Sequence, residues 1–469
     1  MLKAVLFLAS LPLIVFAEAP FDIVVENGRV MDPDSGLDAV RHVGIRDGKI
    51  AAISEEALQG KQVLHASGHV VTAGFIDLHQ HGQSPENYRA QIHDGITSAL
   101  ELEIGVEDIS AWYGEREGKS LVNHGASISH PYSRNVVMTG ENPGLEGDAL
   151  TQPLSSGQLQ KLKQRISRGL DRGAVAVGFG LAYSPGATSE EILAIFRLAA
   201  EFNANCHVHI RTTTGDASNV EEVLDYSRQS GAGLHIVHIN SSGKDLIPQY
   251  LEVIREARES GVDVTTECYP YNRGSTFIES HLFDDWETYS DEKLGQHIWI
   301  ETGEHLSRQT FGRYREQGGI LITQPAYSEE MVRAAVASPL TMIASDGMWL
   351  KKGRAHPRSF GTYSRILGRY VREQKVLSLM DALAKMSLRP AQRLERRVPS
   401  MSNKGRVREG ADADIVVFDP DRVIDKGTFE DPAQNPVGIR HVLVNGVTVL
   451  NEGKLVEGVT PGRAIRGNR

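Results

Sequence analysis

The chain has 469 residues, of which 40% are hydrophobic and 23% are charged. This length allows two or three domains with substantial hydrophobic cores, and the composition is typical of a globular protein. The formal net charge of −10 is mild, and the sequence contains no long run of lysine or arginine. Because nucleic-acid binding needs a clustered basic surface, the charge pattern excludes that class of partner.

The first seventeen residues differ from the rest of the chain. Residues 1–3 include Lys3, residues 4–16 are almost all apolar, and the small residue Ala17 precedes Glu18. This pattern predicts residues 1–17 to be a signal peptide, and therefore a periplasmic or secreted protein without a stable membrane span after cleavage. The alternative is a retained N-terminal anchor, although the apolar run is short for a bilayer span. Cleavage removes only Lys3 among the charged residues, which changes the net charge from −10 to −11.

The two cysteines, Cys206 and Cys268, both lie in apolar, strand-like segments. Export would allow a disulfide between them. The two segments are predicted to be non-adjacent strands of one barrel, which is too far apart for disulfide geometry. We therefore expect two buried free thiols.

Both ends of the chain are rich in short strands with tight turns. The turn signals Asn27-Gly28, Asp47-Gly48 and Asn445-Gly446 each lie between apolar runs, which is typical of β-hairpins. The two ends therefore predict one small β-sandwich domain, formed by residues 18–69 and 401–469.

The middle of the chain, residues 70–400, alternates apolar runs with amphipathic stretches. The apolar runs are 70–72, 98–103, 174–177, 206–210, 234–238, 262–266 and 341–345, and clear helical stretches are 190–202 and 220–229. This alternation predicts an α/β fold with a parallel sheet, and the number of units fits a (β/α)8 TIM barrel. Residues 275–340 are too long for an ordinary crossover and are predicted to be an insertion over the barrel mouth.

Four histidines are predicted to lie at the C-terminal ends of barrel strands. His79 and His81 alternate after the run 73–77, so their side chains face the same side, and His209 and His238 end two later runs. A His-x-His pair alone is weak evidence. Active sites of TIM barrels, however, lie at this end of the strands, and a catalytic zinc needs about three protein ligands and one open position. The pattern therefore predicts a metal centre.

Three carboxylates accompany these histidines. Asp346 ends the run 341–345, where an unpaired carboxylate would be costly, and it is predicted to be a general base that also contacts the metal; the alternative is a helix N-cap. Glu101 and Glu103 face the same side of one strand and would repel each other without a cation between them. Glu103 lies nearer the strand end and is the preferred ligand. Glu101 either contacts a metal-binding side chain or binds the metal itself.

Several longer motifs carry a family resemblance. They are residues 74–81, 180–186, 209–211, 269–271, 345–347, 356–358, 410–414 and 444–446. With these stretches the chain resembles the N-acyl-D-amino-acid deacylases (D-aminoacylases) of the amidohydrolase superfamily, from about residue 22 to residue 465. The resemblance implies a barrel with a β-sandwich, and one tightly bound Zn²⁺ with a second possible.

The resemblance also implies roles for individual residues. Arg358 would grip a carboxylate of the substrate, and Tyr183 and one of Tyr269 or Tyr271 would lie near that carboxylate. The metal and catalytic residues implied are His79, His81, His209, His238 and Asp346.

The sequence departs from the family pattern in two places. The family places a cysteine ligand near the end of an early barrel strand, whereas residues 101–105 contain none and Glu103 lies nearest. Residues 174–181 contain no lysine, which excludes a carboxylated-lysine bridge from that strand. Asn240 also stands where a substrate-binding lysine is expected, and Lys244 could replace that lysine from the following loop.

These observations predict metal-dependent hydrolysis of an amide bond next to a free carboxylate, with N-acyl-D-amino acids as the leading substrates. The alternative enzyme is a secreted dipeptidase or carboxypeptidase-like amidohydrolase. The non-enzymatic alternative is an inactive metal-binding protein, which the presence of Asp346 beside the histidines disfavours.

The signal peptide is directly testable. N-terminal sequencing of the exported protein should begin at Glu18, because the small residue Ala17 ends the apolar run. An intact Met1 on exported, membrane-free protein would contradict this prediction.

Overall fold

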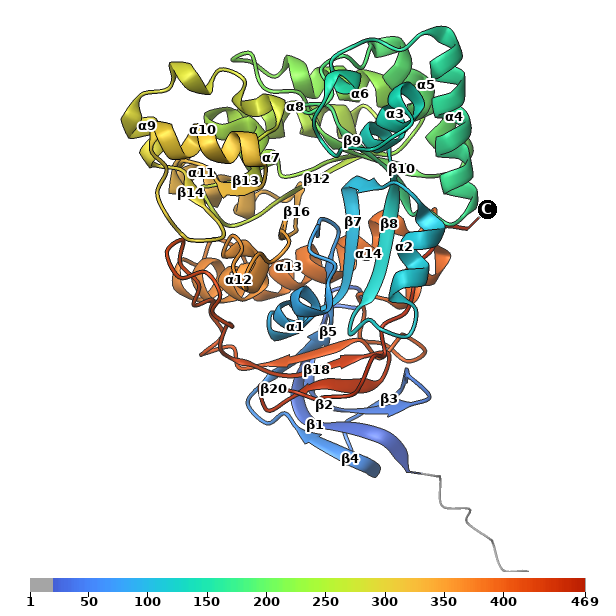
Figure 1. Ribbon diagram of the computed structural model, residues 1–469. Helices are drawn as coiled ribbons and strands as arrows, with labels where there is room; N and C mark the ends of the chain where they lie inside the picture. Colours follow the sequence, from blue (N-terminus) through green and yellow to red (C-terminus); the bar gives the residue numbers. More distant parts are fainter. Residues whose placement is uncertain (1–19, 469) are drawn as a thin grey trace, which may run out of the picture.

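The computed structural model describes residues 20–468. The predicted signal peptide, residues 1–17, lies outside the described residues. Figure 1 shows two parts: a larger part of alternating strands and helices, and a smaller β domain below it that contains the blue strands β1 to β4 and the red strands β18 and β20. Within the described range, no helix has both the length and the apolar character needed to cross a membrane.

The small domain is built around one nine-stranded sheet to which both ends of the chain contribute. The strand order is β20-β19-β18-β17-β5-β1-β2-β3, with β4 paired to β1. The strands are β1 (Phe21–Asp32), β2 (Leu37–Arg46), β3 (Lys49–Ser54), β4 (Gly60–His65), β5 (Val70–Ala73), β17 (Ile415–Phe418), β18 (Ile439–Val444), β19 (Val447–Asn451) and β20 (Lys454–Leu455). The two ends join where β5 pairs antiparallel with β17, with Val71 opposite Val417. This confirms the prediction of one β domain formed by both termini.

Two details of the sequence prediction are wrong. Residues 70–72 belong to the terminal sheet, because β5 pairs with β1 and β17 rather than with a barrel strand. Asn27-Gly28 is not a hairpin turn but a bulge within β1, where the register against β2 shifts and Asn27 adopts φ 56°. Asp47-Gly48 and Asn445-Gly446 do form tight turns, with positive φ at both residues of each pair.

The larger part is an eight-stranded parallel barrel in the order β16-β12-β11-β10-β9-β8-β7-β6. Its strands are β6 (Phe75–Asp77), β7 (Ile96–Val106), β8 (Asn123–Ser129), β9 (Ala176–Gly180), β10 (Asn205–His209), β11 (Leu234–Ile236), β12 (Val264–Cys268) and β16 (Thr341–Ile343). The first and last strands meet just beyond their ends through a bridge between Gln80 and Gly347, and the Ser345 amide donates to the Asp77 carboxylate at 3.1 Å. The barrel prediction is therefore confirmed.

The cysteine prediction is also confirmed. Cys206 lies on β10 and Cys268 on β12, with β11 between these two strands. Both cysteines are buried and free.

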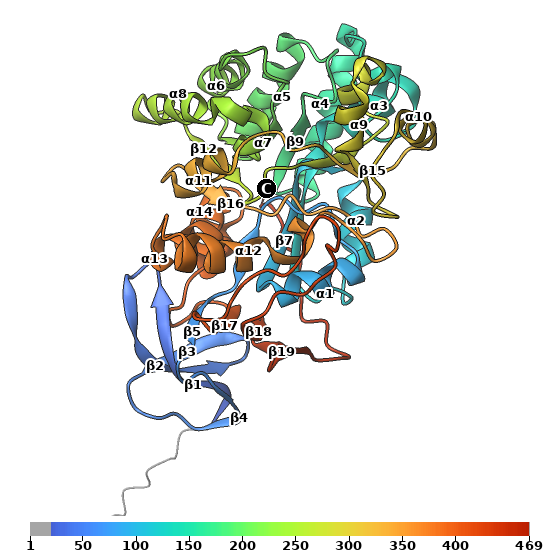
Figure 2. The ribbon, with the colours of Figure 1, turned by 90° about the vertical axis from the view of Figure 1, so that its left-hand side faces the viewer.

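Helices surround the barrel on its outer side (Figures 1 and 2). They are α1 (Pro85–His93), α2 (Ile109–Arg116), α3 (His130–Thr139), α4 (Ser156–Asp171), α5 (Ser189–Glu201), α6 (Ser218–Ser230), α7 (Ile239–Gly243), α8 (Ile247–Glu259), α11 (Glu329–Ala337), α12 (Arg358–Arg365), α13 (Leu379–Leu383) and α14 (Arg389–Leu394). Helix α5 is representative: Thr188 caps its N-terminus, and Ile192, Ile195 and Ala199 bury one face at helical spacing.

Between β12 and β16 the chain forms an additional segment with a sheet of its own. It contains a small antiparallel sheet, in the order β13-β15-β14, of β13 (Ser275–Phe277), β15 (Ile320–Ile322) and β14 (Ile298–Trp299), with helices α9 (Asp291–Gly295) and α10 (Arg308–Gln317). Trp299 stacks on Tyr314 at 4.1 Å between ring centres, so the insertion has an apolar core of its own. The crossover to β16 is completed by α11.

Candidate metal-dependent active site

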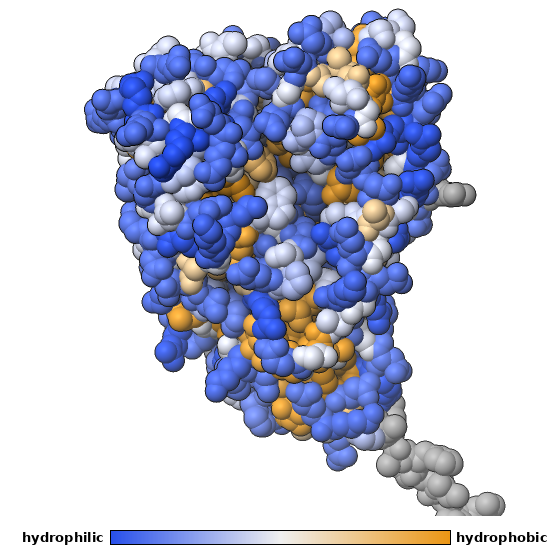
Figure 3. Space-filling view, in the orientation of Figure 1, coloured by the Kyte–Doolittle hydropathy of each residue, from blue (hydrophilic) through white to orange (hydrophobic). Residues whose placement is uncertain are grey.

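A cavity of about 630 Å³ lies at the C-terminal ends of the barrel strands. Its walls come from these strand ends and from the insertion, which contributes Ser275, Phe277 and Leu282 among others. Figure 3 shows a mostly hydrophilic face that is hollowed near its centre. This is the end of a barrel where catalytic groups collect, because the loops that follow the strands meet there.

The four predicted histidines and Asp346 gather at this end of the barrel from four strands, because His79 and His81 both follow β6. His209 is the last residue of β10, His79 and His238 lie two residues beyond β6 and β11, and Asp346 lies three residues beyond β16. Glu101 and Glu103 lie on β7 and both are buried. The structure therefore brings together residues that are up to 267 positions apart, from His79 to Asp346.

Glu103 stands at the centre of the histidines. Its Oε1 lies 2.7 Å from His209 Nδ1 and 2.8 Å from His238 Nε2. Its Oε2 lies 3.2 Å from both His79 Nε2 and His81 Nε2. Each carboxylate oxygen thus faces one pair of imidazoles, which is the arrangement of a carboxylate that bridges two cation sites.

The spacing of the imidazole nitrogens in each pair suits binding of a metal ion better than hydrogen bonding between the two rings. The Nε2 atoms of His79 and His81 are 3.1 Å apart, and His238 Nε2 is 3.0 Å from His209 Nδ1. Without a cation, each such contact needs one shared proton, whereas nitrogen and oxygen donors converging on one point suit a divalent ion such as zinc. Two groups meet this description: His79, His81 and Glu103, and Glu103, His209 and His238.

Glu101 plays a different part from Glu103. Its Oε2 accepts a hydrogen bond from His81 Nδ1 at 2.7 Å, and its Oε1 accepts one from the Gly105 amide at 3.2 Å. It therefore contacts His81 on the side away from Glu103. Of the two alternatives left by the sequence, the structure places Glu103 among the candidate ligands and Glu101 behind one of them.

Two of these residues have unusual backbone conformations. His238 adopts φ 30° and ψ 56°, and Asp346 adopts φ 51°, in the left-handed region that non-glycine residues rarely occupy. Such conformations cost of order 1–3 kcal/mol each and persist where the surrounding structure enforces them. Here they turn both side chains from the strand ends toward the cavity.

The charges in the site shift the pKa values of its groups. Burial lowers the pKa of His79, but Asp346 and Glu103 outweigh it and raise this pKa well above its usual value. Burial raises the pKa of Asp346, but the Arg358 guanidinium and His79 outweigh it and lower this pKa. Burial and His238 lower the pKa of His209, which favours the neutral imidazole that a metal requires.

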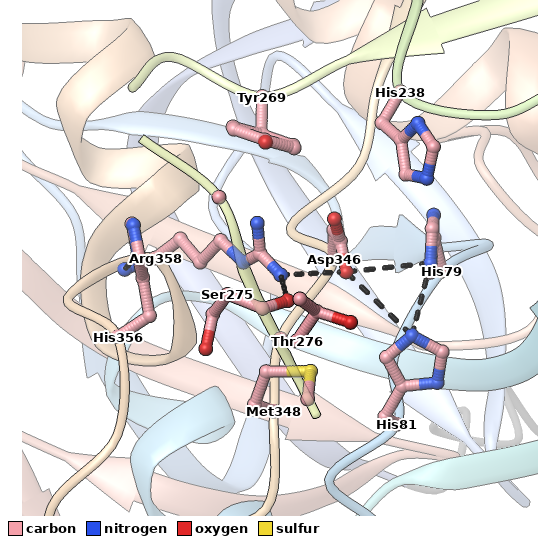
Figure 4. Close-up of polar contacts among 12 residues, drawn as sticks. His79, His81, His238, Tyr269, Ser275, Thr276, Asp346, Met348, His356 and Arg358 are labelled. Atoms are coloured by element: carbon pink, nitrogen blue, oxygen red, sulfur yellow. Dashed lines mark hydrogen bonds and ion pairs between the residues drawn. The ribbon is translucent and has the colours of Figure 1, made fainter. Parts of the chain in front are cut away.

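Asp346 links the histidines to Arg358 (Figure 4). Its Oδ1 lies 3.4 Å from His79 Nε2, 3.6 Å from His81 Nε2 and 2.8 Å from Arg358 Nη2. Arg358 is the first residue of α12, is almost fully buried and lies over the ring of Tyr269 at 4.7 Å. The candidate base and the candidate anchor of the substrate are thus direct neighbours.

Arg358 retains free donors that point to a ligand. Its Nε and Nη1 make no hydrogen bond to any residue within 20–468, and the same holds for the hydroxyl of Tyr269. Buried donors of this kind normally have partners. A planar carboxylate is the group that a guanidinium pairs with best, through two parallel hydrogen bonds.

The structure separates the predicted tyrosines and Asn240 by whether they line the cavity. Tyr183 and Tyr269 line the cavity, whereas Tyr271 and Asn240 do not. Tyr271 packs beneath Arg365 at 4.6 Å and faces the Asp425 carboxylate instead. The Asn240 amide donates to the Tyr269 carbonyl at 2.9 Å and to the Tyr327 hydroxyl at 2.7 Å. Its side chain is therefore used in hydrogen bonds within the fold.

Three residues in and around the site were not predicted from the sequence. Trp349 stacks on His81 at 5.4 Å, and Lys293 of the insertion lines the same cavity as Lys244. Glu267 contacts His79 from β12, but the predicted run ended one residue before it. One sequence feature could have indicated Glu267. It is a carboxylate two residues after Thr265, and it therefore lies on the same face of an apolar strand.

Comparison with known proteins agrees with this geometry. The profile of the amidohydrolase family matches residues 146–450. The chain is 32% identical to an N-acyl-D-glutamate deacylase of Alcaligenes xylosoxydans xylosoxydans over 95% of this chain and 96% of that protein. The chain belongs to the amidohydrolase family.

Two further relatives are similar to the chain over nearly its whole length. A D-aminoacylase of the same organism is 26% identical over 92% of this chain and 95% of that protein. The crystal structure of an N-acyl-D-glutamate deacylase from Bordetella bronchiseptica, complexed with zinc and a phosphonate inhibitor that mimics the tetrahedral intermediate, superposes with a TM-score of 0.82 and 28% identity. It covers 96% of this chain and 100% of that chain.

The bridging position of Glu103 predicts the effect of removing it. Glu103→Gln keeps the size of the side chain but removes its charge, so the protein should lose at least one equivalent of bound zinc. Free zinc at about 100 times its Kd should stabilise the parent protein by about 2.7 kcal/mol in thermal unfolding, and the variant should gain less.

The exposed Glu115→Gln serves as the matched control for this variant, because its side chain is 71% exposed. Zinc content and thermal unfolding of this control should equal those of the parent protein. A metal-bound crystal structure in which Glu101 and Glu103 both point away from the metal would contradict the bridging interpretation.

Proposed function

We propose that this protein is a zinc-dependent hydrolase of an amide bond next to a free carboxylate, with N-acyl-D-amino acids as the leading substrates. The observation that carries the proposal is the position of Asp346, whose Oδ1 lies between the Nε2 atoms of His79 and His81 and the guanidinium of Arg358. A base beside a metal site and a carboxylate anchor beside the base are the two groups that this reaction requires.

The cation would be held by the four histidines and Glu103. Bound zinc supplies Lewis acidity, which polarises an amide carbonyl and makes water more acidic. Asp346, kept ionised by Arg358, accepts a proton from the attacking water and returns it to the nitrogen of the leaving amine. The new C–O bond forms first, the C–N bond breaks when the nitrogen receives the proton, and the products are a carboxylic acid and a free amine.

Arg358 would orient the substrate. Its unpaired Nη1 or Nε, together with the second hydrogen of Nη2, donates to the substrate carboxylate while the first hydrogen of Nη2 remains on Asp346, with the hydroxyl of Tyr269 as a further donor. Fixing the carboxylate in this way sets the distance between the amide and the base, which is a large part of catalysis by positioning. The relatives, an N-acyl-D-glutamate deacylase and a D-aminoacylase, support an acyl amino acid as the substrate.

The walls and the volume of the cavity limit which substrates can bind. One wall is apolar and includes Ile104, Leu145 and Tyr183, while Lys244 and Lys293 also line the cavity. The volume of about 630 Å³ also favours a second candidate, a dipeptidase-like activity, because it exceeds what a small acyl amino acid needs.

Rates on N-acetyl-D- and L-amino acids and on dipeptides, measured with zinc-loaded mature protein, decide between the two substrate classes. Inactivity on every compound of the panel would contradict the proposal.

We also propose that the enzyme acts outside the cytoplasm, in the periplasm or as a secreted protein. Support for this comes from the N-terminal sequence alone, in which a positive start, an apolar run and Ala17 follow one another.

Asp346→Asn should keep the bound zinc but lower kcat by about 10²–10⁴-fold. The amide has the size of the carboxylate but cannot accept the proton from water. Zinc content and thermal unfolding of the variant establish that the site is intact. Near-normal turnover by a zinc-loaded variant would exclude Asp346 as the base.

Arg358→Lys should lower kcat/KM for an N-acyl amino acid by about 10²-fold or more, because lysine offers a point charge where arginine offers a bidentate pair. A substrate whose carboxylate is replaced by an amide should be poor for the parent enzyme and should lose little further activity in the variant.

Comparing both substrates with both proteins separates substrate binding from support of the loop. Equal losses on the acid and on its amide would mean that Arg358 acts only by holding Asp346 and its neighbours in place.

A further inference from the structure

A second buried carboxylate lies directly behind His79. Glu267, on β12, is fully buried inside the barrel, and its Oε1 accepts a hydrogen bond from His79 Nδ1 at 2.7 Å. Its Oε2 accepts one from His235 Nε2 at 2.9 Å. His235 Nδ1 in turn contacts the Thr265 hydroxyl at 2.7 Å. The four side chains form one chain of contacts that runs inward from the site.

This chain of contacts selects the tautomer of a neutral His79. A carboxylate only accepts hydrogen bonds, so the proton of a neutral His79 lies on Nδ1 and the lone pair lies on Nε2. The Nε2 atom is the one that faces His81 and Glu103.

We infer that Glu267, braced by His235 and Thr265, is a positioning residue that holds His79 in the orientation and tautomer needed to bind a cation. The inference rests on the metal centre proposed above. Carboxylates behind metal-bound histidines increase the basicity of the ligand and lock its ring, and their removal typically weakens metal binding 10–100-fold. Glu267 does so from a strand on which no predicted ligand lies.

The other three histidines do not depend on Glu267. His81 has Glu101 behind it, His238 Nδ1 contacts the Ser242 hydroxyl at 3.2 Å, and His209 faces Glu103 through its own Nδ1. The influence of Glu267 is therefore confined to the half of the site formed by His79, His81 and Glu103. The half formed by Glu103, His209 and His238 should keep its affinity when Glu267 is changed.

The test is zinc binding by Glu267→Gln, measured by competition with a chromophoric chelator. The glutamine oxygen can accept a hydrogen bond from only one imidazole and presents its NH₂ group to the other. We expect one equivalent of zinc to bind 10–100-fold more weakly than in the parent protein, with the second equivalent unchanged. Equal affinities for both equivalents in the variant and the parent would overturn the inference.

Glu191→Gln is the matched control. Glu191 is also buried and also contacts a histidine, His130, at 2.9 Å, but this pair lies outside the metal groups. Both variants remove one buried charge beside an imidazole, so thermal unfolding of the two measures the general cost. If both variants lose zinc affinity to the same extent, the role of Glu267 is merely structural and the inference fails.

A measurement on the parent protein decides the question if Glu267→Gln does not fold. The ¹⁵N shifts of labelled histidine rings, with the His79 signals assigned by their absence in His79→Gln, should show the proton of His79 on Nδ1 in the zinc-loaded protein. A proton on Nε2 would overturn the inference. A parent protein that binds no zinc would overturn the metal centre itself, an outcome distinct from equal binding by the parent and Glu267→Gln.

Discussion

The contact of one buried carboxylate with four imidazoles governs the architecture of this protein. Glu103 can meet His79, His81, His209 and His238 only if β6, β7, β10 and β11 are parallel and end at the same level. A closed barrel satisfies this requirement, because it brings the ends of strands that are distant in sequence to one opening. The closing contacts between the first and last strands lie beside the site, at Gln80 and Gly347.

Such a site does not stabilise the fold by itself. Buried carboxylates and a buried guanidinium lose hydration, and the gain from pairing them only partly offsets that loss. His238 and Asp346 add backbone strain to this cost. The large apolar core between the barrel and its helices, and the separate core of the terminal sheet, provide the stabilisation that makes the arrangement possible.

The terminal β domain contributes to the site through its connection to the first barrel strand. Strand β5 pairs with β17 and passes directly into β6, with Gly74 between them. A Cβ atom on Gly74 would lie 2.2 Å from the Thr97 hydroxyl oxygen, so only glycine allows this close approach to β7. The sheet formed by both ends of the chain thus sets where β6 begins. His79 and His81 follow four and six residues after Phe75, the first residue of β6.

The sequence alone determined the local features of the site. Alternation with a period of two placed His79 with His81, and Glu101 with Glu103, on common faces, and strand-helix alternation gave the barrel and the opening at which they meet. Only the tertiary structure decided which partner each group has. It placed Glu103 between the histidines and Glu101 behind His81, paired Arg358 with Asp346, and separated Tyr269 from Tyr271. It also turned Asn27-Gly28 into a bulge and brought Glu267 to His79 across 188 residues. The physical reason is that a period fixes the face on which a side chain lies, whereas a contact between distant strands depends on barrel closure and register, which no local pattern encodes.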